Sequence, residues 1–272
     1  IESARKCRDL WFGSWLLSEL ARAAARGIVD AEGRAEGDVL VFPGASVADT
    51  SRAVANRIVA RINGPAAEVA AAAERAMRAR LSELRDQAFQ LVAPRHPRRA
   101  ELFHEETARE QVDSAIELLW ASAERPEYRD ALDQADRLLA AVKNTKVWSQ
   151  PAWAKDGVPK SSLDGIRESV LDEALFDGRS RTGGEAHLRR SFGVHGSERL
   201  CGVGVLKRFG RTKGETDCPD RIFSTSHVAS GPFRAGLRRT GGGEGVPRLQ
   251  RARAGGAPPP PGGVGGPGCG RP

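Results

Sequence analysis

The stretch that decides the fold is the first, residues 1–27, which read IESARKCRDLWFGSWLLSELARAAARG. Apolar residues recur in it at helical spacing, which predicts one long helix ending at the turn that starts at Gly27. Gly13 and Ser14 flank the apolar stripe, so we expect the helix to approach a sheet closely there. The stripe consists of Leu10, Leu17, Ala21, Ala24 and Ile28.

A second apolar face lies opposite this stripe, where Phe12 and Trp15 stand among charged residues. A surface helix ordinarily keeps its far side polar. Two apolar faces therefore indicate a second packing partner. That partner is either another domain, subunit or preceding segment, or a later part of this same chain, and the sequence favours neither.

The next segments alternate between strand and helix signals. Residues 39–42 (VLVF) form a β-rich run that Pro43 stops. Residues 54–62 (VANRIVARI) suit helix or strand equally by periodicity. Asn63 and Gly64 signal a turn, and Pro65 opens an Ala-rich stretch, residues 65–92, that predicts a helix.

Residues 114–123 (SAIELLWASA) carry the same helix-or-strand ambiguity, and residues 126–143 predict another helix with Pro126 at its start. The resulting order fits the β-α-β-β-α-β pattern of a ferredoxin-like unit if a first strand precedes Ile1. We therefore expect an α+β domain over residues 1–125 that lacks its first strand, followed by a mostly helical segment over residues 126–234. Within that segment we expect a short helix near residues 166–176 and either strand or helix over residues 200–206.

Residues 235–272 are rich in Gly, Pro and Arg and cannot bury enough surface to fold, so we expect them to be disordered. They hold six Arg and one Glu, which leaves +2 of the chain's net charge of +7 for the remainder. The composition of this tail fits a frameshifted GC-rich reading frame or a basic RNA-binding arm. The frameshift is favoured, because the tail has no aromatic residue for base stacking and no Lys.

Composition excludes several classes of protein. No apolar run in the 272 residues approaches the length of a membrane span. The four cysteines form no C-x-x-C pair, which indicates unpaired thiols in a reducing, cytoplasmic setting and predicts no metal site. No His-Asp doublet and no paired-carboxylate hairpin turn occurs, so we predict no catalytic residue in this chain.

The best candidate for ligand contact is PKSSLDGIRES, residues 159–169. It places Lys160, Ser161, Ser162 and Arg167 just before the expected helix, where free N–H groups favour an anion. An ordinary N-capped helix explains the same residues. His195 and His227, flanked by Gly or Ser, are further candidates, each with a structural role as the alternative.

Several of these stretches together resemble one family, the large subunit of type III-B CRISPR effector complexes, the Cmr complexes. The resemblance runs from Ile1 to about Phe233 and rests on residues 3–24, 39–43, 54–62, 160–170, 193–208 and 223–229. It implies that residues 1–125 are the first of two cyclase-like palm domains, with strands at 56–63 and 114–123. It also adds Arg199 to the candidate nucleotide or RNA contacts.

The family binds ATP on its palm pair and, with target RNA bound, makes cyclic oligoadenylate with divalent metal (Mg²⁺ or Mn²⁺). In that family the metal-binding GGDD turn lies on the second palm, and an HD nuclease domain, where present, lies upstream; this sequence contains neither. Related subunits often have zinc-binding cysteines where this chain has Ser161, Ser162 and Asp164, so no zinc site carries over.

The resemblance therefore implies a fragment of a crRNA-guided antiviral effector, not an enzyme by itself and without a cofactor of its own. It would contribute a nucleotide-binding palm surface and contacts to other Cmr subunits, and through them to crRNA and target RNA. The alternative is a non-catalytic helical adaptor whose basic tail binds RNA. Loss of salt-dependent RNA binding on deletion of the tail would favour the adaptor.

Overall fold

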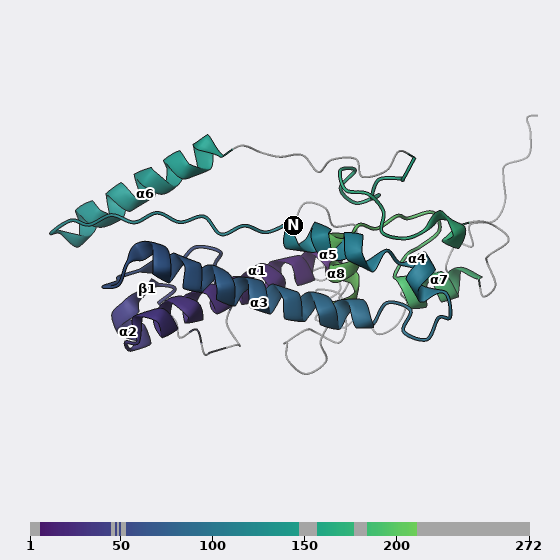
Figure 1. Cartoon of the computed structure of the whole chain (residues 1–272), viewed down its shortest axis with the longest axis horizontal. Coiled ribbons are helices and arrows are strands. Elements are labelled where there is room, and N and C mark those ends of the chain that lie inside the picture. Colours follow the sequence, from purple (N-terminus) through teal and green to yellow (C-terminus); the bar gives the residue numbers. More distant parts are fainter. Residues whose placement is uncertain are drawn as a thin grey trace, which may run out of the picture. The chain divides into compact units, whose positions relative to one another are not determined.

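The computed structural model describes residues 6–44, 47, 49, 53–146, 157–176 and 184–210, except for the side chains of 184–187. These residues are mostly helical, with one small antiparallel sheet (Figure 1). They all belong to the first of two units of the chain, residues 1–224. None of the helices described is both long enough and apolar enough to cross a membrane. The expected disordered tail, residues 235–272, lies outside the described residues.

The predicted opening helix is confirmed as α1, Cys7–Glu32, but its predicted end at Gly27 is wrong, because the helix continues through that residue. It ends at Gly33, which adopts the left-handed conformation (φ 61°) and donates its N–H to the carbonyl of Val29. A residue without Cβ adopts that conformation at little cost, which is why glycine so often terminates helices.

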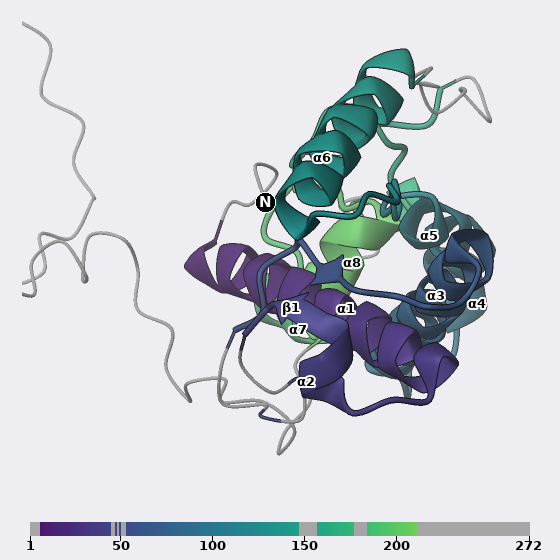
Figure 2. The ribbon, with the colours of Figure 1, turned by 90° about the vertical axis from the view of Figure 1, so that its left-hand side faces the viewer.

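The Ala-rich stretch forms α3, Ala66–Gln90, and α3 lies alongside α1 (Figure 1 and Figure 2). Pro65 precedes the first helical residue, as the sequence predicts. The two helices bury a row of apolar side chains between them in one continuous core. From α1 these are Phe12, Leu16, Leu20 and Ala24, and from α3 they are Ala73, Met77, Leu81, Leu84 and Ala88.

The predicted packing face of α1 is wrong. Leu10 of the expected stripe is 44% exposed, whereas Phe12, assigned to the far side, is 2% exposed. The face centred on Phe12, Leu16 and Leu20 carries the larger side chains and therefore removes more apolar area from water. Its partners are α3 and α8, so a later part of this chain covers the second face.

Three shorter helices complete this core. They are α4 (Arg99–Leu102), α5 (Glu105–Asp113) and α8 (Gly202–Phe209), and both α5 and α8 contact α3. Residues 200–206 are therefore mostly helical, which resolves that ambiguity. The ring of Phe89 at the end of α3 meets Phe103 edge-on, with 5.3 Å between ring centroids. A further helix, α7 (Gly184–Phe192), buries Phe192 in the same core.

The sheet is smaller than predicted. After the short helix α2 (Glu36–Val39), β1 (Leu40–Phe42) pairs antiparallel with β2 (Val59–Ala60). Residues 114–123 form no strand, because in the part of the chain that is described no neighbour pairs with them. The described residues thus form a mixed, mostly helical fold, and a complete ferredoxin-like sheet is not among its parts.

The predicted second-half helix is α6, Tyr128–Thr145, and it buries none of its residues. It is tied to the sheet by polar contacts, namely an exposed ion pair of Arg57 with Asp136 (2.9 Å) and the guanidinium of Arg61 over the ring of Tyr128. An amphipathic helix ordinarily packs its apolar stripe on a core. In this fold the stripe of α6 stays open.

The α1–α3 contact is tight at Gly27. A Cβ at this position would lie 2.8 Å from the carbonyl oxygen of Ala72 and 2.9 Å from the Cβ of Ala76. The small residues of both helices are therefore required where the two backbones approach.

We predict that Gly27→Ala destabilises the protein by about 1–3 kcal/mol, the usual cost of overpacking. Elsewhere in a helix the same change stabilises by up to about 1 kcal/mol. The matched control is Gly37→Ala in α2, where the added Cβ meets nothing within 4 Å. Urea unfolding followed by circular dichroism measures both, and equal effects of the two changes would contradict this packing.

Candidate functional site

The segment predicted to contact a ligand folds back on itself. Lys160 and Glu168 form an antiparallel bridge, and the N–H of Ser161 donates to the carbonyl of Arg167 (2.8 Å). The helix expected near residues 166–176 is wrong. Only a single 3₁₀ turn, η1 (Glu173–Leu175), forms there, because the bridge and a positive φ at Gly165 (64°) turn the chain. The helix N-terminus that motivated an anion site is therefore absent from these residues.

The two serines hold this loop in place. Ser161 is buried, and its hydroxyl accepts the N–H of Leu163 (3.3 Å). Ser162 exchanges two hydrogen bonds with Arg199, because its N–H donates to the Arg199 carbonyl and its hydroxyl accepts the Arg199 N–H, both at 2.9 Å. The structure thus brings Arg199 beside the two serines.

Each cation of the predicted set already has a carboxylate partner. Lys160 lies 3.7 Å from Glu168, and Arg167 lies 3.3 Å from Asp164. Arg199 makes a two-pronged ion pair with Glu173, with distances of 2.7 and 2.5 Å, and its guanidinium stacks on Phe176.

The three ion pairs make the loop electrically balanced. An anionic ligand would have to displace a carboxylate from each pair, so the geometry gives these residues a structural role. The N-capped helix that the sequence allowed as the alternative does not form over these residues either, and they belong to a hydrogen-bonded loop instead.

Of the two candidate histidines, His195 lies among the described residues. The backbone N–H of His195 donates to the carboxylate of Glu198 (3.2 Å), and the Glu198 N–H returns a bond to the His195 carbonyl. This closes the turn at Gly196, which has φ 54°. His227 lies outside the described residues.

The strongest polar site was missed by sequence reasoning. Arg208 of α8 is buried, and its Nε donates to both carboxylate oxygens of Asp9 (2.9 and 2.8 Å). Its Nη2 donates to Glu198 (2.8 Å), and its Nη1 donates to the carbonyl of Gly193 (2.5 Å). Asp9 is fully buried in the first turn of α1. A signal existed, because Asp9 falls on the same helical face as Phe12 and Leu16.

Arg208 also sets the ionisation of this site. Burial would raise the pKa of Glu198, but the hydrogen bonds and charge of Arg208 outweigh burial and hold that pKa below its ordinary value. Burial would lower the pKa of Arg208, and its two carboxylate partners raise it instead. The Glu198 carboxylate and the guanidinium therefore stay ionised together at neutral pH.

Next to it, Lys207 and Cys201 are also buried. Burial lowers the pKa of Lys207 and raises the pKa of the Cys201 thiol, which lies 3.4 Å from the Asp164 carboxylate. Over the described residues, no three His, Cys, Asp or Glu side chains are grouped so that they could hold a metal ion.

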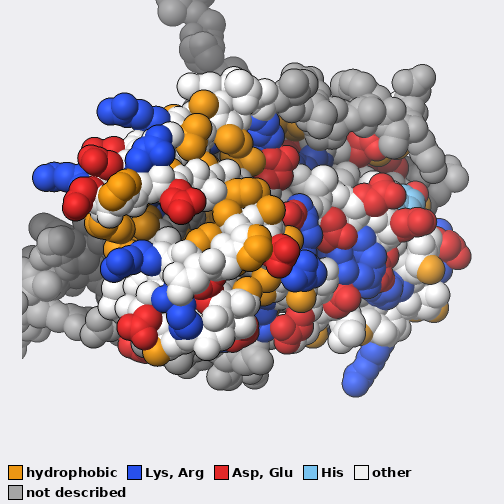
Figure 3. Space-filling view, turned by 60° about the vertical axis from the view of Figure 1, so that its left-hand side comes forward, with side chains coloured by type: hydrophobic (Ala, Val, Ile, Leu, Met, Phe, Trp, Pro, Cys, Tyr) orange, Lys and Arg blue, Asp and Glu red, His pale blue; other side chains and the backbone are white. Residues whose placement is uncertain are grey.

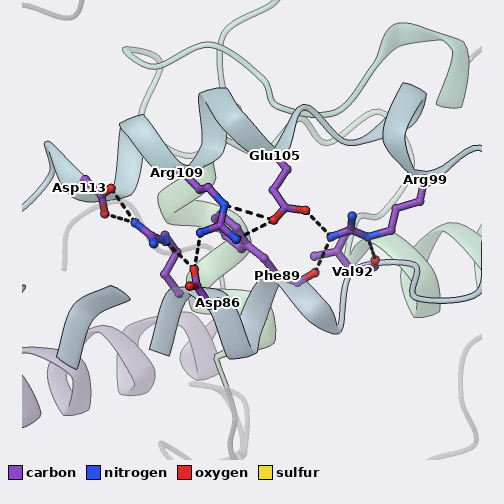
Figure 4. A network of polar contacts seen from close by, with 8 residues as sticks. Asp86, Phe89, Val92, Arg99, Glu105, Arg109 and Asp113 are labelled. Carbon is purple, nitrogen blue, oxygen red and sulfur yellow. Dashed lines mark hydrogen bonds and ion pairs between the residues drawn. The ribbon is translucent and has the colours of Figure 1, made fainter. Parts of the chain in front are cut away.

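A second network runs along α3, α4 and α5 (Figure 4). It alternates acid and base in the order Asp113, Arg85, Asp86, Arg109, Glu105 and Arg99. At its end, Arg99 donates to the carbonyls of Phe89 and Val92, both at 2.9 Å. The network fixes α5 on α3 and holds the chain where it leaves α3.

Comparison with known proteins gives one match. A family model described as CRISPR-associated protein Cmr2, N-terminal, matches residues 1–125. No curated protein and no solved structure matches the chain.

The buried Arg208 site predicts a mutational effect that depends on pH. We expect Arg208→Met to cost about 3–5 kcal/mol at pH 7, since it leaves Asp9 and Glu198 buried without their cation. In the native protein, the stability contributed by the depressed pKa of Glu198 is lost as the pH falls through that pKa. In the variant the buried Glu198 carboxyl has lost the cation that lowers its pKa, so it takes up a proton at higher pH and the stability gap narrows on acidification.

Urea unfolding at pH 7 and pH 4 measures this gap. Arg199→Met, at the more exposed ion pair with Glu173, is the matched control and should cost about 1 kcal/mol or less. A gap for Arg208→Met that stays constant between the two pH values would contradict the role given to Arg208.

Proposed function

We propose that this chain, which over residues 1–125 belongs to the Cmr2 family of type III-B CRISPR large subunits, acts as an assembly part of that effector complex. In this proposal it docks onto the rest of the complex through one open apolar face. That face is formed by β1, residues 115–127 and α6, and we call it the sheet face. Through the sheet face the chain contacts other Cmr subunits, and through those subunits it is linked to crRNA and target RNA.

The observation that supports this proposal is the exposure of large apolar side chains on the sheet face. Trp120 is 44% exposed and Tyr128 is 43% exposed. Figure 3 shows hydrophobic side chains gathered in the open, with charged side chains around them. Large contiguous apolar surface in a monomer marks an interaction site. The set comprises Val41, Phe42, Leu119, Trp120, Tyr128, Leu138 and Val142.

The backbone of the sheet face supports the same proposal. In the described residues β2 pairs only with β1, and no strand is paired along its other edge. Residues 116–124 run on from α5 without a pairing strand. An unpaired edge is a ready template for a further strand. A strand added there would extend the sheet toward the palm surface that the family resemblance implies, with the apolar stripe of α6 packed on it.

We assign no catalytic step to this chain. ATP and Mg²⁺ or Mn²⁺ belong, in this proposal, to the palm chemistry of the parent subunit. In the part of the chain that is described, no three His, Cys, Asp or Glu side chains are grouped for a metal ion, so we name no residue here as a ligand.

The proposal predicts that the purified chain alone makes no oligoadenylate from ATP, since the sequence contains no GGDD turn. Incubation with radiolabelled ATP and either Mg²⁺ or Mn²⁺, followed by chromatography, measures the product. Metal-dependent oligoadenylate synthesis in the gel-filtration fractions that contain the chain would show that the chain does have a catalytic role.

The docking role predicts that charge on the apolar stripe of α6 blocks assembly. We expect Leu138→Glu with Val142→Glu to abolish co-purification with the other Cmr subunits. Both side chains are exposed in the chain by itself, so the change should leave its thermal unfolding almost unaltered.

The matched control places the same two charges on the opposite side of the same helix, as Ala140→Glu with Asn144→Glu, which are both exposed. The control should assemble normally. Equal assembly of both variants would show that the sheet face is not the docking surface.

A further inference from the structure

The loop between α3 and α4 is basic and lies against α7. The N–H of Ala93 donates to the carbonyl of Ser191 (2.8 Å), and the ring of His96 meets Phe192 edge-on, with centroids 5.7 Å apart. These contacts bring two arginine pairs from distant parts of the sequence together. Arg95 and Arg98 come from the loop, and Arg189 and Arg190 come from the last turn of α7.

The loop is held rigidly, so its arginines are not free to fold inward. The N–H of His96 donates to the Ala93 carbonyl, and the N–H of Arg99 donates to the His96 carbonyl. Arg99 itself points into the network of Figure 4 and anchors the carbonyl of Val92. Arg95 and Arg98 are left exposed on the outside of this turn.

The charges on this surface lack the balance seen elsewhere. Among the described residues no carboxylate pairs with Arg95, Arg189 or Arg190, and all three are exposed. Arg98 pairs with Glu101, but that pair is itself exposed and therefore weak. By contrast, Arg85, Arg109 and the cations of the 159–169 loop all have carboxylate partners.

The positive charge extends to the start of α1. The pKa of Lys6 is lowered, first by burial and then by the positive charges of Arg208 and Arg189, although Glu198 and Asp9 act in the opposite direction. Arg189 is therefore close enough to Lys6 to repel its charge. The basic surface is defined as Lys6, Arg95, Arg98, Arg189 and Arg190.

We propose that this basic surface binds the backbone phosphates of single-stranded nucleic acid. A guanidinium presents parallel N–H groups that match a phosphate, and several held on a rigid turn pre-organise a track for a charged backbone. His96 is engaged with Phe192 and no other aromatic residue belongs to the surface, so base stacking plays no part. The binding is thus sequence-independent and sensitive to salt.

This inference rests on the arginine geometry and stands apart from the proposed docking of the sheet face. Its test is the binding of a fluorescein-labelled 20-nucleotide uridine RNA to the full chain, followed by anisotropy over a range of salt concentrations. The test variant combines Arg95→Gln, Arg189→Gln and Arg190→Gln. The control combines Arg75→Gln, Arg129→Gln and Arg137→Gln, which removes the same charge from exposed arginines elsewhere.

We expect the test variant to bind about 10–100-fold more weakly near 0.1 M salt, and the slope of log K against log salt to become shallower by about 2, since each lost phosphate contact on a single strand contributes about 0.7. The control should bind as the native chain does. Circular dichroism checks that both variants remain folded.

Unchanged affinity of the test variant, or an equal loss in the control, would overturn the proposal. Equally effective displacement of RNA by polyglutamate would do the same, because it would identify an acidic protein as the partner. The α6 variant with Leu138→Glu and Val142→Glu should bind RNA normally, so failure of the docking role and failure of this one are distinguishable.

Discussion

The guanidinium of Arg208 joins parts of the chain that lie far apart in sequence, because it bonds to Asp9, 199 residues earlier, and to Glu198, 10 residues earlier. A buried charge is tolerated only when its partners are held in place around it. The first turn of α1, the turn before α8 and α8 itself must therefore form together. This requirement fixes the register of α8 on α1 and closes one end of the helical core.

With that end closed, α1, α3, α5 and α8 bury their large side chains against one another, and they do so without a sheet. Apolar side chains are thus covered between these four helices and left uncovered on the side that carries the short strands and α6. Exposed apolar side chains remain on β1 and α6, and among the described residues no further strand pairs with β2. This asymmetry is what connects the fold to an assembly role, since a surface of this kind is stabilised only when a partner covers it.

Sequence reasoning found the long helices because their apolar spacing and the Pro at the start of α3 are local signals, although it ended α1 at Gly27, inside the helix. It failed where contacts between residues far apart in the sequence determine the structure. Periodicity placed the packing face of α1 around Leu10, whereas the contact with α3 and α8 selects Phe12 and Leu16. The strand expected at 114–123 needs a neighbour, and local sequence cannot supply one.

The candidate site shows the same limit. The residues Ser161, Ser162 and Arg199 do come together, but the carboxylates that neutralise the nearby cations could not be seen from the motif alone. Arg208 and Asp9 were overlooked because a charged residue on an apolar helix face indicates a buried ion pair only when the helix face that packs against it is also known. The resemblance indicated a family where motifs could not, and the family match supports it over residues 1–125.

The central claim is that the helical core is self-supporting while the sheet face is completed by a partner. Hydrogen–deuterium exchange, read by mass spectrometry on the chain alone and on the chain within an assembled Cmr complex, tests it most directly. The account predicts slow exchange in α1, α3 and α8 in both states, and exchange in residues 115–146 that is fast alone and slow in the complex. Fast exchange throughout α1 and α3 in the chain alone, or no change in residues 115–146 on assembly, would contradict it.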